Sequence, residues 1–147
     1  MHGMGVMAEE GKSVYDGQWV NGTKHGVGVM IYHTQVRDFS CYDGEWAKNL
    51  RTGHGRFTYW DGSSYDGYVM NSKRHGQGKL TMADGSSYEG EWQSNVKQGK
   101  GKLTYPDKSF YEGDWVADKK HGQGFFKDAT EEYDGAWVDD VRNGEGK

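Results

Sequence analysis

The sequence predicts an all-β fold: a twisted, elongated rod made of a single-layer antiparallel sheet of β-hairpins, that is, a β-solenoid. Three observations lead to this prediction. A five-residue aromatic motif recurs with its tyrosines 27, 23, 23, 23 and 22 residues apart. A Gly-x-Gly motif keeps step with it, and large side chains alternate with charged ones around both motifs. Such self-similarity at a fixed period is the sequence signature of a repeat architecture.

The first motif reads Tyr-acid-Gly-x-aromatic and predicts the first strand of each hairpin. Successive side chains of a strand point to opposite faces. In the copy at 88–92, Tyr88, Gly90 and Trp92 would therefore share one face, with Glu89 and Glu91 on the other. The final position is Trp in every copy but one, which has Val69. The repeats start at Tyr15, Tyr42, Tyr65, Tyr88, Tyr111 and Tyr133.

The second motif, Gly-x-Gly, predicts the second strand. Its first glycine follows the aromatic position by seven residues. We expect a polar turn at 95–98, a strand over 99–105 and a turn at 83–86 leading to the next tyrosine. A helix is excluded because each interior glycine would destabilise it by about 1 kcal/mol. The four extra residues between Ile31 and Tyr42 should lengthen one loop.

The composition fits a fold in which aromatic rings cover glycines. The chain has 24 glycines, a single proline and 14% aromatic residues, while only 33% of its residues are hydrophobic. A ring beside a glycine can shield bare backbone, and identical rings stacked on successive hairpins would contribute about 0.2–1 kcal/mol per cross-strand pair. Thirteen such strands would span about 60 Å.

The repeats run through residues 1–147 as one continuous array. Gly3 and Gly5 have the spacing of an earlier, incomplete repeat, and the last Gly-x-Gly ends at Gly146. Because repeat arrays normally end in polar capping repeats, we expect this array to be part of a longer one, or its ends to be covered by another chain.

These motifs resemble the MORN repeat. The resemblance is carried by Tyr88-Glu89-Gly90-Glu91-Trp92, a polar turn with a basic residue, and Gly-x-Gly-x-aliphatic-Thr-Tyr-x-Asp-Gly, and it covers essentially the whole chain. Val69 and Lys108, which replaces a loop glycine, depart from the pattern. The resemblance implies scaffolding, binding of helical partner segments along an aromatic groove, dimerisation and, in some members, contact with phosphoinositides. All-repeat chains of this kind resemble cytoskeletal MORN proteins of protists.

The aromatic positions are the predicted partner-binding face. A single-layer sheet has no second sheet over that face, so some apolar surface should stay open, and such surfaces mark partner sites. The residues are Tyr15, Trp19, Tyr42, Trp46, Tyr65, Tyr88, Trp92, Tyr111 and Trp115. Self-association is expected through exposed sheet edges, as a homodimer or higher assembly, with the interface around Tyr133, Trp137 and Val138.

A basic residue lies five positions after each aromatic position. This basic row is Lys24, Arg51, Arg74, Lys97, Lys120 and Arg142. One interpretation is a phosphoinositide-binding edge for membrane recruitment. The other is solvated turn cations and cross-strand ion pairs, each contributing little. The net charge of -4 and the isoelectric point of 5.8 weaken the lipid interpretation and argue against a nucleic-acid partner.

Nothing in the repeats predicts catalysis, a cofactor or a metal site. The glycine pairs recur within strands and lack a following Gly-Lys-Ser/Thr, so they are not a nucleotide loop. Histidines at equal repeat positions, such as His75 and His121, would be at least 10 Å apart, too far for ligands to share one zinc; a site between two chains stays open. We therefore expect a non-catalytic scaffold that binds itself and protein partners.

The expected location is inside the cell, in the cytoplasm, the cytoskeleton or a membrane-associated assembly. The single cysteine, Cys41, gives no disulfide framework. The first residues have neither the basic region nor the apolar stretch of a secretory signal.

Overall fold

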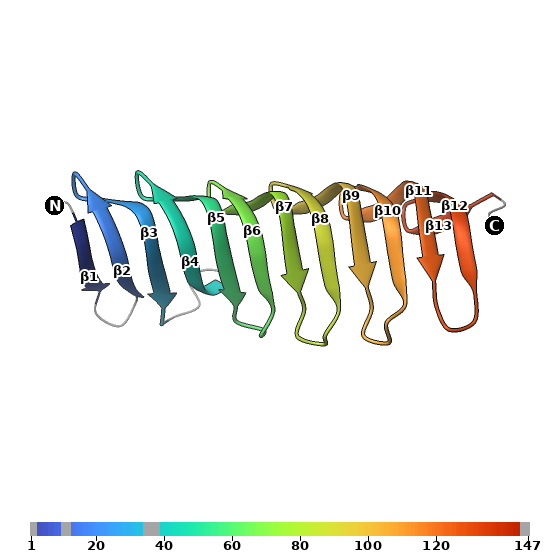
Figure 1. The fold of residues 1–147 in the computed structure, drawn as a ribbon, viewed down its shortest axis with the longest axis horizontal. Coiled ribbons are helices and arrows are strands. Elements are labelled where there is room, and N and C mark those ends of the chain that lie inside the picture. Colours follow the sequence, from blue (N-terminus) through green and yellow to red (C-terminus); the bar gives the residue numbers. More distant parts are fainter. Residues whose placement is uncertain (1–2, 10–12, 34–38, 145–147) are drawn as a thin grey trace. The chain divides into compact units, whose positions relative to one another are not determined.

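The computed structural model describes residues 3–9, 13–33 and 39–144. Over these ranges the protein is all-β: thirteen strands follow one another in sequence order in an antiparallel sheet, and no helix is present (Figure 1). The predicted fold class is confirmed. The chain divides into two compact units, residues 1–74 and 75–147, which are described separately below.

The strands form successive hairpins within each unit. The first unit contains β1 (Gly3–Glu9), β2 (Ser13–Val20), β3 (Thr23–Tyr32), β4 (Phe39–Ala47), β5 (Leu50–Tyr59) and β6 (Ser64–Met70). At the boundary lies β7 (Lys73–Thr81), and the second unit continues with β8 (Ser87–Gln93), β9 (Val96–Thr104), β10 (Phe110–Val116), β11 (Lys119–Lys127), β12 (Glu132–Val138) and β13 (Val141–Asn143).

Each hairpin closes through a two-residue turn, which lies earlier than the sequence indicated. Ser94 and Asn95 join β8 to β9 with φ of 47° and 73°, and two successive positive φ values are the type I′ pattern that matches strand twist. The predicted turn at 95–98 is therefore wrong: Val96, Lys97 and the residue after it belong to β9. Polarity suggested a turn, but positive φ decides where the chain reverses.

These turns also attach each hairpin to the preceding one. The Asp118 carboxylate accepts a hydrogen bond of 2.8 Å from the Lys97 amide, and the Asp118 amide donates to the Lys97 carbonyl at 3.1 Å. In the first unit, Asn49 makes the same pair of bonds with Lys24, at 2.7 Å and 3.0 Å. The backbone amide and carbonyl of Lys97 and of Lys24 are satisfied in this way by the following hairpin.

The opposite ends of the strands are joined by loops built on an aspartate. In the predicted turn at 83–86, which is confirmed, the Asp84 carboxylate accepts hydrogen bonds from the Ser86 amide at 2.9 Å and the Ser86 hydroxyl at 2.6 Å. Gly85 has φ of 93°. Lys108 occupies the same place with φ of 75°, a conformation that L-residues adopt with strain.

The tyrosine rings lie on paired glycines, as predicted. A Cβ built on Gly101 would lie 2.1 Å from the Tyr88 hydroxyl and 2.3 Å from its ring carbon Cζ. A Cβ on Gly90, which pairs with Gly101, would lie 2.4 Å from the Gly101 Cα. Only hydrogen fits at these positions, so the repeated glycines make room for a flat ring against the backbone.

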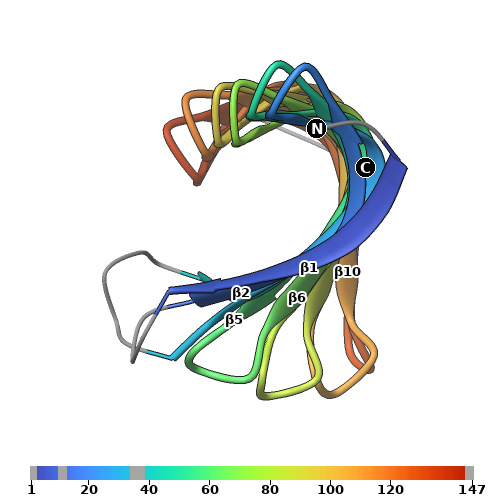
Figure 2. The same cartoon turned by 90° about the vertical axis from the view of Figure 1, so that its left-hand side faces the viewer.

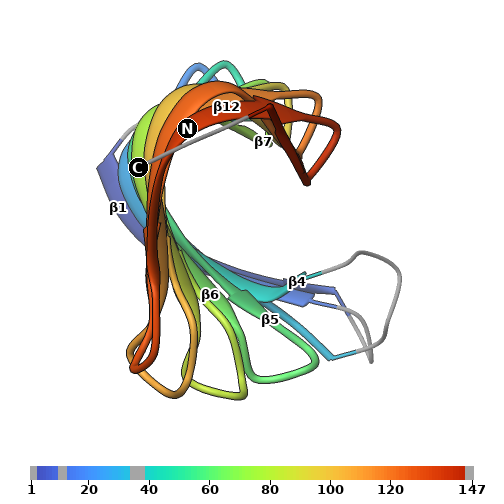
Figure 3. The ribbon, with the colours of Figure 1, turned by 90° about the vertical axis from the view of Figure 1, so that its right-hand side faces the viewer.

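The strands are bent, as β2 shows in the first unit (Figure 2) and β12 in the second (Figure 3). In the β2–β3 pair the register shifts between Gly17 and Trp19, and β-bulges of this kind increase local bend and twist. The insertion after Ile31 falls largely on residues 34–38, outside the described residues. The strand that follows, β4, is nine residues long, and its pairing with β5 has a further register shift between Phe39 and Cys41.

Candidate functional site

The face of each strand that carries tyrosine, glycine and tryptophan is here called the aromatic face, and the opposite one the outer face. The rings of the aromatic face are buried: none of its motif tyrosines and tryptophans is more than 7% exposed. Each tyrosine hydroxyl donates to the carbonyl three residues later, as Tyr88 does to Glu91 at 3.0 Å. The rings therefore form the core, and the tyrosine hydroxyls are satisfied, whereas the Trp19 indole nitrogen is buried without a hydrogen-bond partner.

Tyrosines and tryptophans alternate between neighbouring repeats. Tyr88 meets Trp92 of its own strand edge-on at 5.0 Å and Trp115 of the next repeat edge-on at 5.2 Å. The Trp115 indole donates to the Gly101 carbonyl at 3.0 Å. The expectation that rings stack on like rings is therefore wrong. A pleated sheet places Trp of one repeat against Tyr of the previous one, in the T-shaped arrangement that aromatic quadrupoles favour.

The row of predicted partner-binding residues is thus brought together in the structure, but as packed side chains. From the sequence, the ring faces were expected to stay exposed because a single-layer sheet has no second layer to cover them. They cover one another, and the basic row covers them further. A partner on this face would meet cations and ring edges first, and the role of these rings in partner binding stays a prediction.

The basic residues lie over the rings rather than in the turns. Lys97 places its Nζ 5.6 Å from the Tyr88 ring centroid and 5.5 Å from that of Trp115. Lys24 spans Tyr15 and Trp46 in the same way, at 5.5 Å and 5.8 Å. The interpretation as solvated turn cations is wrong, because the turn is shorter than expected and each cation faces the aromatic side of its strand.

Arg51 is the most enclosed of these cations. Its guanidinium lies 4.9 Å from the Phe39 centroid and 5.0 Å from the Trp46 centroid, and donates to the Ser72 hydroxyl at 2.9 Å. Burial lowers the pKa of Arg51 to about 10, so the group is still charged at neutral pH. Arg142 lies over Tyr133 at 5.0 Å and pairs with Glu131 at 2.6 Å. The basic row is therefore a set of cation–π contacts.

Of the residues predicted for a dimer interface, two are internal. Tyr133 and Trp137 are buried and pack edge-on at 5.4 Å. Val138 lies on the other side of β12 and is 42% exposed, and it pairs with Val141 of β13. Val138 and its cross-strand neighbour Val141 therefore present exposed apolar surface. Their part in self-association stays a prediction.

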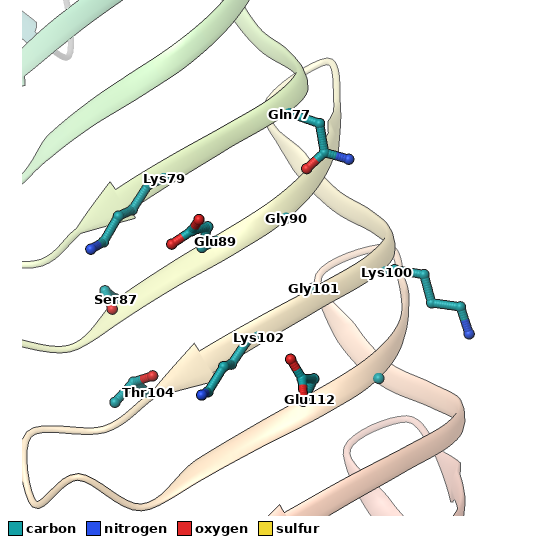
Figure 4. A pocket seen from close by; sticks show the side chains of 11 residues that line it. Gln77, Lys79, Ser87, Glu89, Gly90, Lys100, Gly101, Lys102, Thr104 and Glu112 are labelled. Carbon is teal, nitrogen blue, oxygen red and sulfur yellow. The ribbon is translucent and has the colours of Figure 1, made fainter.

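The outer face of the second unit carries an alternating lattice of charges. Lys79 pairs across strands with Glu89, Glu89 with Lys102, and Lys102 with Glu112. Figure 4 shows these side chains standing around a hollow on β7 to β10, with Gly90 and Gly101 at its centre. The expected acid-bearing face is confirmed. Over β7 to β10 the cross-strand neighbours of its acids are lysines, whereas on β11 Phe125 stands beside Glu112 and Asp134.

Sequence reasoning missed the residue between glycine and tryptophan. The Asp114 carboxylate accepts a hydrogen bond of 2.9 Å from the Gln123 amide at the bulge, and Gln18 and Glu91 do the same for Val27 and Lys100. A hydrogen bond from Lys100 holds the pKa of Asp114 below its usual range. The frequent Asp, Glu or Gln at this position was the available signal.

His75 and His121 bond to turn residues, whereas the His54 imidazole lies 3.5 Å from the Asp66 carboxylate. His75 Nδ1 accepts a hydrogen bond from the Ser94 amide at 3.3 Å. In the parts of the chain that the structure describes, no three His, Cys, Asp or Glu side chains are grouped so that they could hold a metal ion. The same parts include no helix capable of crossing a membrane.

The geometry and the comparisons agree on the family. The MORN repeat family model matches residues 15–37, 42–64, 65–87, 88–110, 111–130 and 133–147. No curated protein matched the sequence. The matched segments begin at the tyrosines that lie on the glycine pairs, and together they cover most of the chain. The chain is a member of the MORN repeat family.

Proposed function

We propose that this protein is a non-catalytic interaction scaffold that binds protein partners along its aromatic face and associates with itself. MORN repeats in general have roles in protein interaction or at membranes. The observation that carries the proposal is the basic row, whose cations lie over aromatic rings, with Lys97 and Lys120 each held over rings of two successive repeats. We place the protein inside the cell, in a cytoskeletal or membrane-associated assembly.

The basic row gives the aromatic face a regular positive pattern. Lys97 and Lys120 each lie over aromatic rings about 5.6 Å away, so their ammonium groups are held in place before any partner arrives. Such preorganisation reduces the entropy lost on binding. Successive cations are two strands apart, about 10 Å. Acidic side chains seven residues apart on a helix have nearly the same spacing, because a helix rises about 1.5 Å per residue.

Charge reversal on the aromatic face tests this mode of binding. In the Lys97→Glu/Lys120→Glu variant we expect binding of a synthetic amphipathic helix with glutamates seven residues apart to weaken at least tenfold, measured by fluorescence anisotropy. The matched control is Lys79→Glu/Lys102→Glu, which makes the same change in net charge on the outer face of the same unit. Equal losses in both variants would mean that only net charge matters and would remove the aromatic face from the proposal.

The second candidate function is phosphoinositide binding by the same basic row. It is favoured by the regular cations and opposed by the net charge of -4 and by the burial of Arg51. Co-sedimentation with vesicles that contain phosphoinositide, using the same two variants, separates the candidates. Loss of vesicle binding in Lys97→Glu/Lys120→Glu but not in the control would favour the lipid function, whereas peptide binding without vesicle binding would favour the protein scaffold.

Self-association is expected to involve the apolar surface at Val138 and Val141. A Val138→Lys variant should shift the mass measured by light scattering toward the monomer, since the lysine would place a charge on the apolar surface that a second chain would cover. Val116→Lys is the matched control, because Val116 ends β10 as Val138 ends β12 and is similarly exposed. A parent chain that stays monomeric over a concentration series would contradict self-association altogether.

A further inference from the structure

The outer face of the first unit departs from the charged pattern of the second. At the positions where β9 carries Lys100 and Lys102, β3 carries Val27 and Val29. Val27 is 53% exposed, and Met4 and Val6 on β1, which is separated from β3 by β2, are 69% and 67% exposed. In the first unit, β1 and β3 thus carry apolar side chains on the outer face, at repeat positions where β9 of the second unit carries lysines.

The acids of the repeat are nevertheless retained there. The cross-strand neighbours of Asp16 are Val6 and Val29, whereas those of Glu89, at the same repeat position, are Lys79 and Lys102. No lysine or arginine stands at the outer-face positions of β1 to β4 that the structure describes. On β3, valines stand where lysines would balance these acids, so Asp16 has no cationic cross-strand neighbour and Asp43 has one, Arg56 of β5.

We propose that this outer patch, formed by Met4, Val6, Val27, Val29, Asp16 and Asp43, docks a basic amphipathic segment of a partner protein. The apolar side chains of the partner segment would cover the valines, and the lysines or arginines of that segment would pair with the aspartates. Charge complementarity identifies the partner class: Asp16 has no cationic cross-strand neighbour and Asp43 has only Arg56, so the patch keeps a negative charge that repels an acidic segment and an anionic membrane alike. The site is distinct from the aromatic face, both in position and in the charge that it recognises.

The spacing of the acids constrains the partner further. Asp16 on β2 and Asp43 on β4 both flank Val29 of β3, so they are two strand spacings apart, about 10 Å. A helix laid across the strands would present cations seven residues apart at about 10.5 Å. Apolar residues between those cations would face Val6, Val27 and Val29.

The test uses the full chain and a synthetic helical peptide with a leucine stripe and lysines seven residues apart, followed by fluorescence anisotropy. Val27→Lys/Val29→Lys gives β3 the residues that β9 already carries, and should weaken binding at least tenfold. Asp16→Asn/Asp43→Asn should weaken binding and flatten its dependence on salt. Gln77→Lys/Thr81→Lys adds the same charge at repeat positions of β7 equivalent to Val27 and Ile31, and should leave binding unchanged.

Folding of each variant is checked by thermal unfolding, and if Val27→Lys/Val29→Lys fails to fold, the aspartate variant carries the test. No saturable binding by the folded parent, equal affinity in the valine and control variants, or equal affinity for a peptide with glutamate in place of lysine would each overturn the proposal. The variant Lys97→Glu/Lys120→Glu should bind this peptide as the parent does, which separates the outer patch from the aromatic face.

Discussion

Raising the pH from 10 to 12 is expected to unfold this protein cooperatively, because buried tyrosines cannot ionise in the folded chain. Burial, with the nearby Asp114 adding to it, raises the pKa of Tyr111 from 10.0 to about 12. Burial also raises the pKa of Tyr15, Tyr42 and Tyr88 above the ordinary value. In the unfolded chain the same hydroxyls would ionise near pH 10.

The sign of the effect follows from proton binding. Each of these tyrosines has a higher pKa folded than unfolded, so its contribution to stability is complete below pH 10 and is lost as the pH rises toward the folded value. Between the two values the free energy of unfolding falls by about 1.4 kcal/mol per pH unit for each tyrosine. Because several identical repeats contribute, the loss is steep.

The transition is followed by circular dichroism together with tyrosinate absorbance, and the two signals should coincide. A Tyr88→Phe variant should give a shallower transition, since one ionising group is removed. The control is Tyr68→Phe, because Tyr68 is exposed on the outer face. Tyrosinate formation that is complete before the circular dichroism changes would contradict the burial of these rings.

Gly101→Ala is expected to lower the free energy of unfolding by about 1–3 kcal/mol, the usual range for forcing a group into a filled core. The added Cβ would lie 2.1 Å from the Tyr88 hydroxyl, on a ring that is held by its bond to Glu91 and by contact with Trp115. The ring can move only by disturbing both neighbours.

Gly5→Ala is the matched control for this substitution. Gly5 holds the same place in its Gly-x-Gly motif as Gly101, but a Cβ there would lie 3.7 Å from the Trp19 indole nitrogen, an ordinary contact. Thermal and chemical unfolding of both variants compare the two. Equal effects would mean that glycine is needed for the strand itself and not for the tyrosine ring.

Sequence reasoning reached the strands and their faces because alternation in this chain is strict. Tyr88, Gly90 and Trp92 are buried while Glu89 is exposed, as the pleat requires. The seat of each tyrosine on a glycine pair was also predictable, since large and small residues recur together. These features depend on residues within one hairpin, and the number of residues between them is enough to predict that they lie side by side.

The rest depended on backbone geometry that composition does not reveal. The position of the Ser94–Asn95 turn fixes the register, and the register decides that Lys97 faces the rings. Asn or Asp at the second turn position, as in Asn95 and Asp118, was a usable signal for positive φ. The outer patch could have been found by aligning the repeats, because Val27 and Val29 replace residues that are polar in the next three copies.

The hydrogen bonds that tie each turn to the preceding hairpin set an order of assembly. The backbone amides of Lys24, Lys97 and Lys120 donate hydrogen bonds to the side chains of Asn49, Asp118 and Asp140. These partners lie 25, 21 and 20 residues further along the chain. Every such partner lies downstream, as does the tryptophan that covers each tyrosine from the next repeat. On the ribosome, a hairpin would therefore stay unfinished until the following one emerges. With contacts this local, the nascent chain can extend its structure from the N-terminus as it is made, one period behind synthesis.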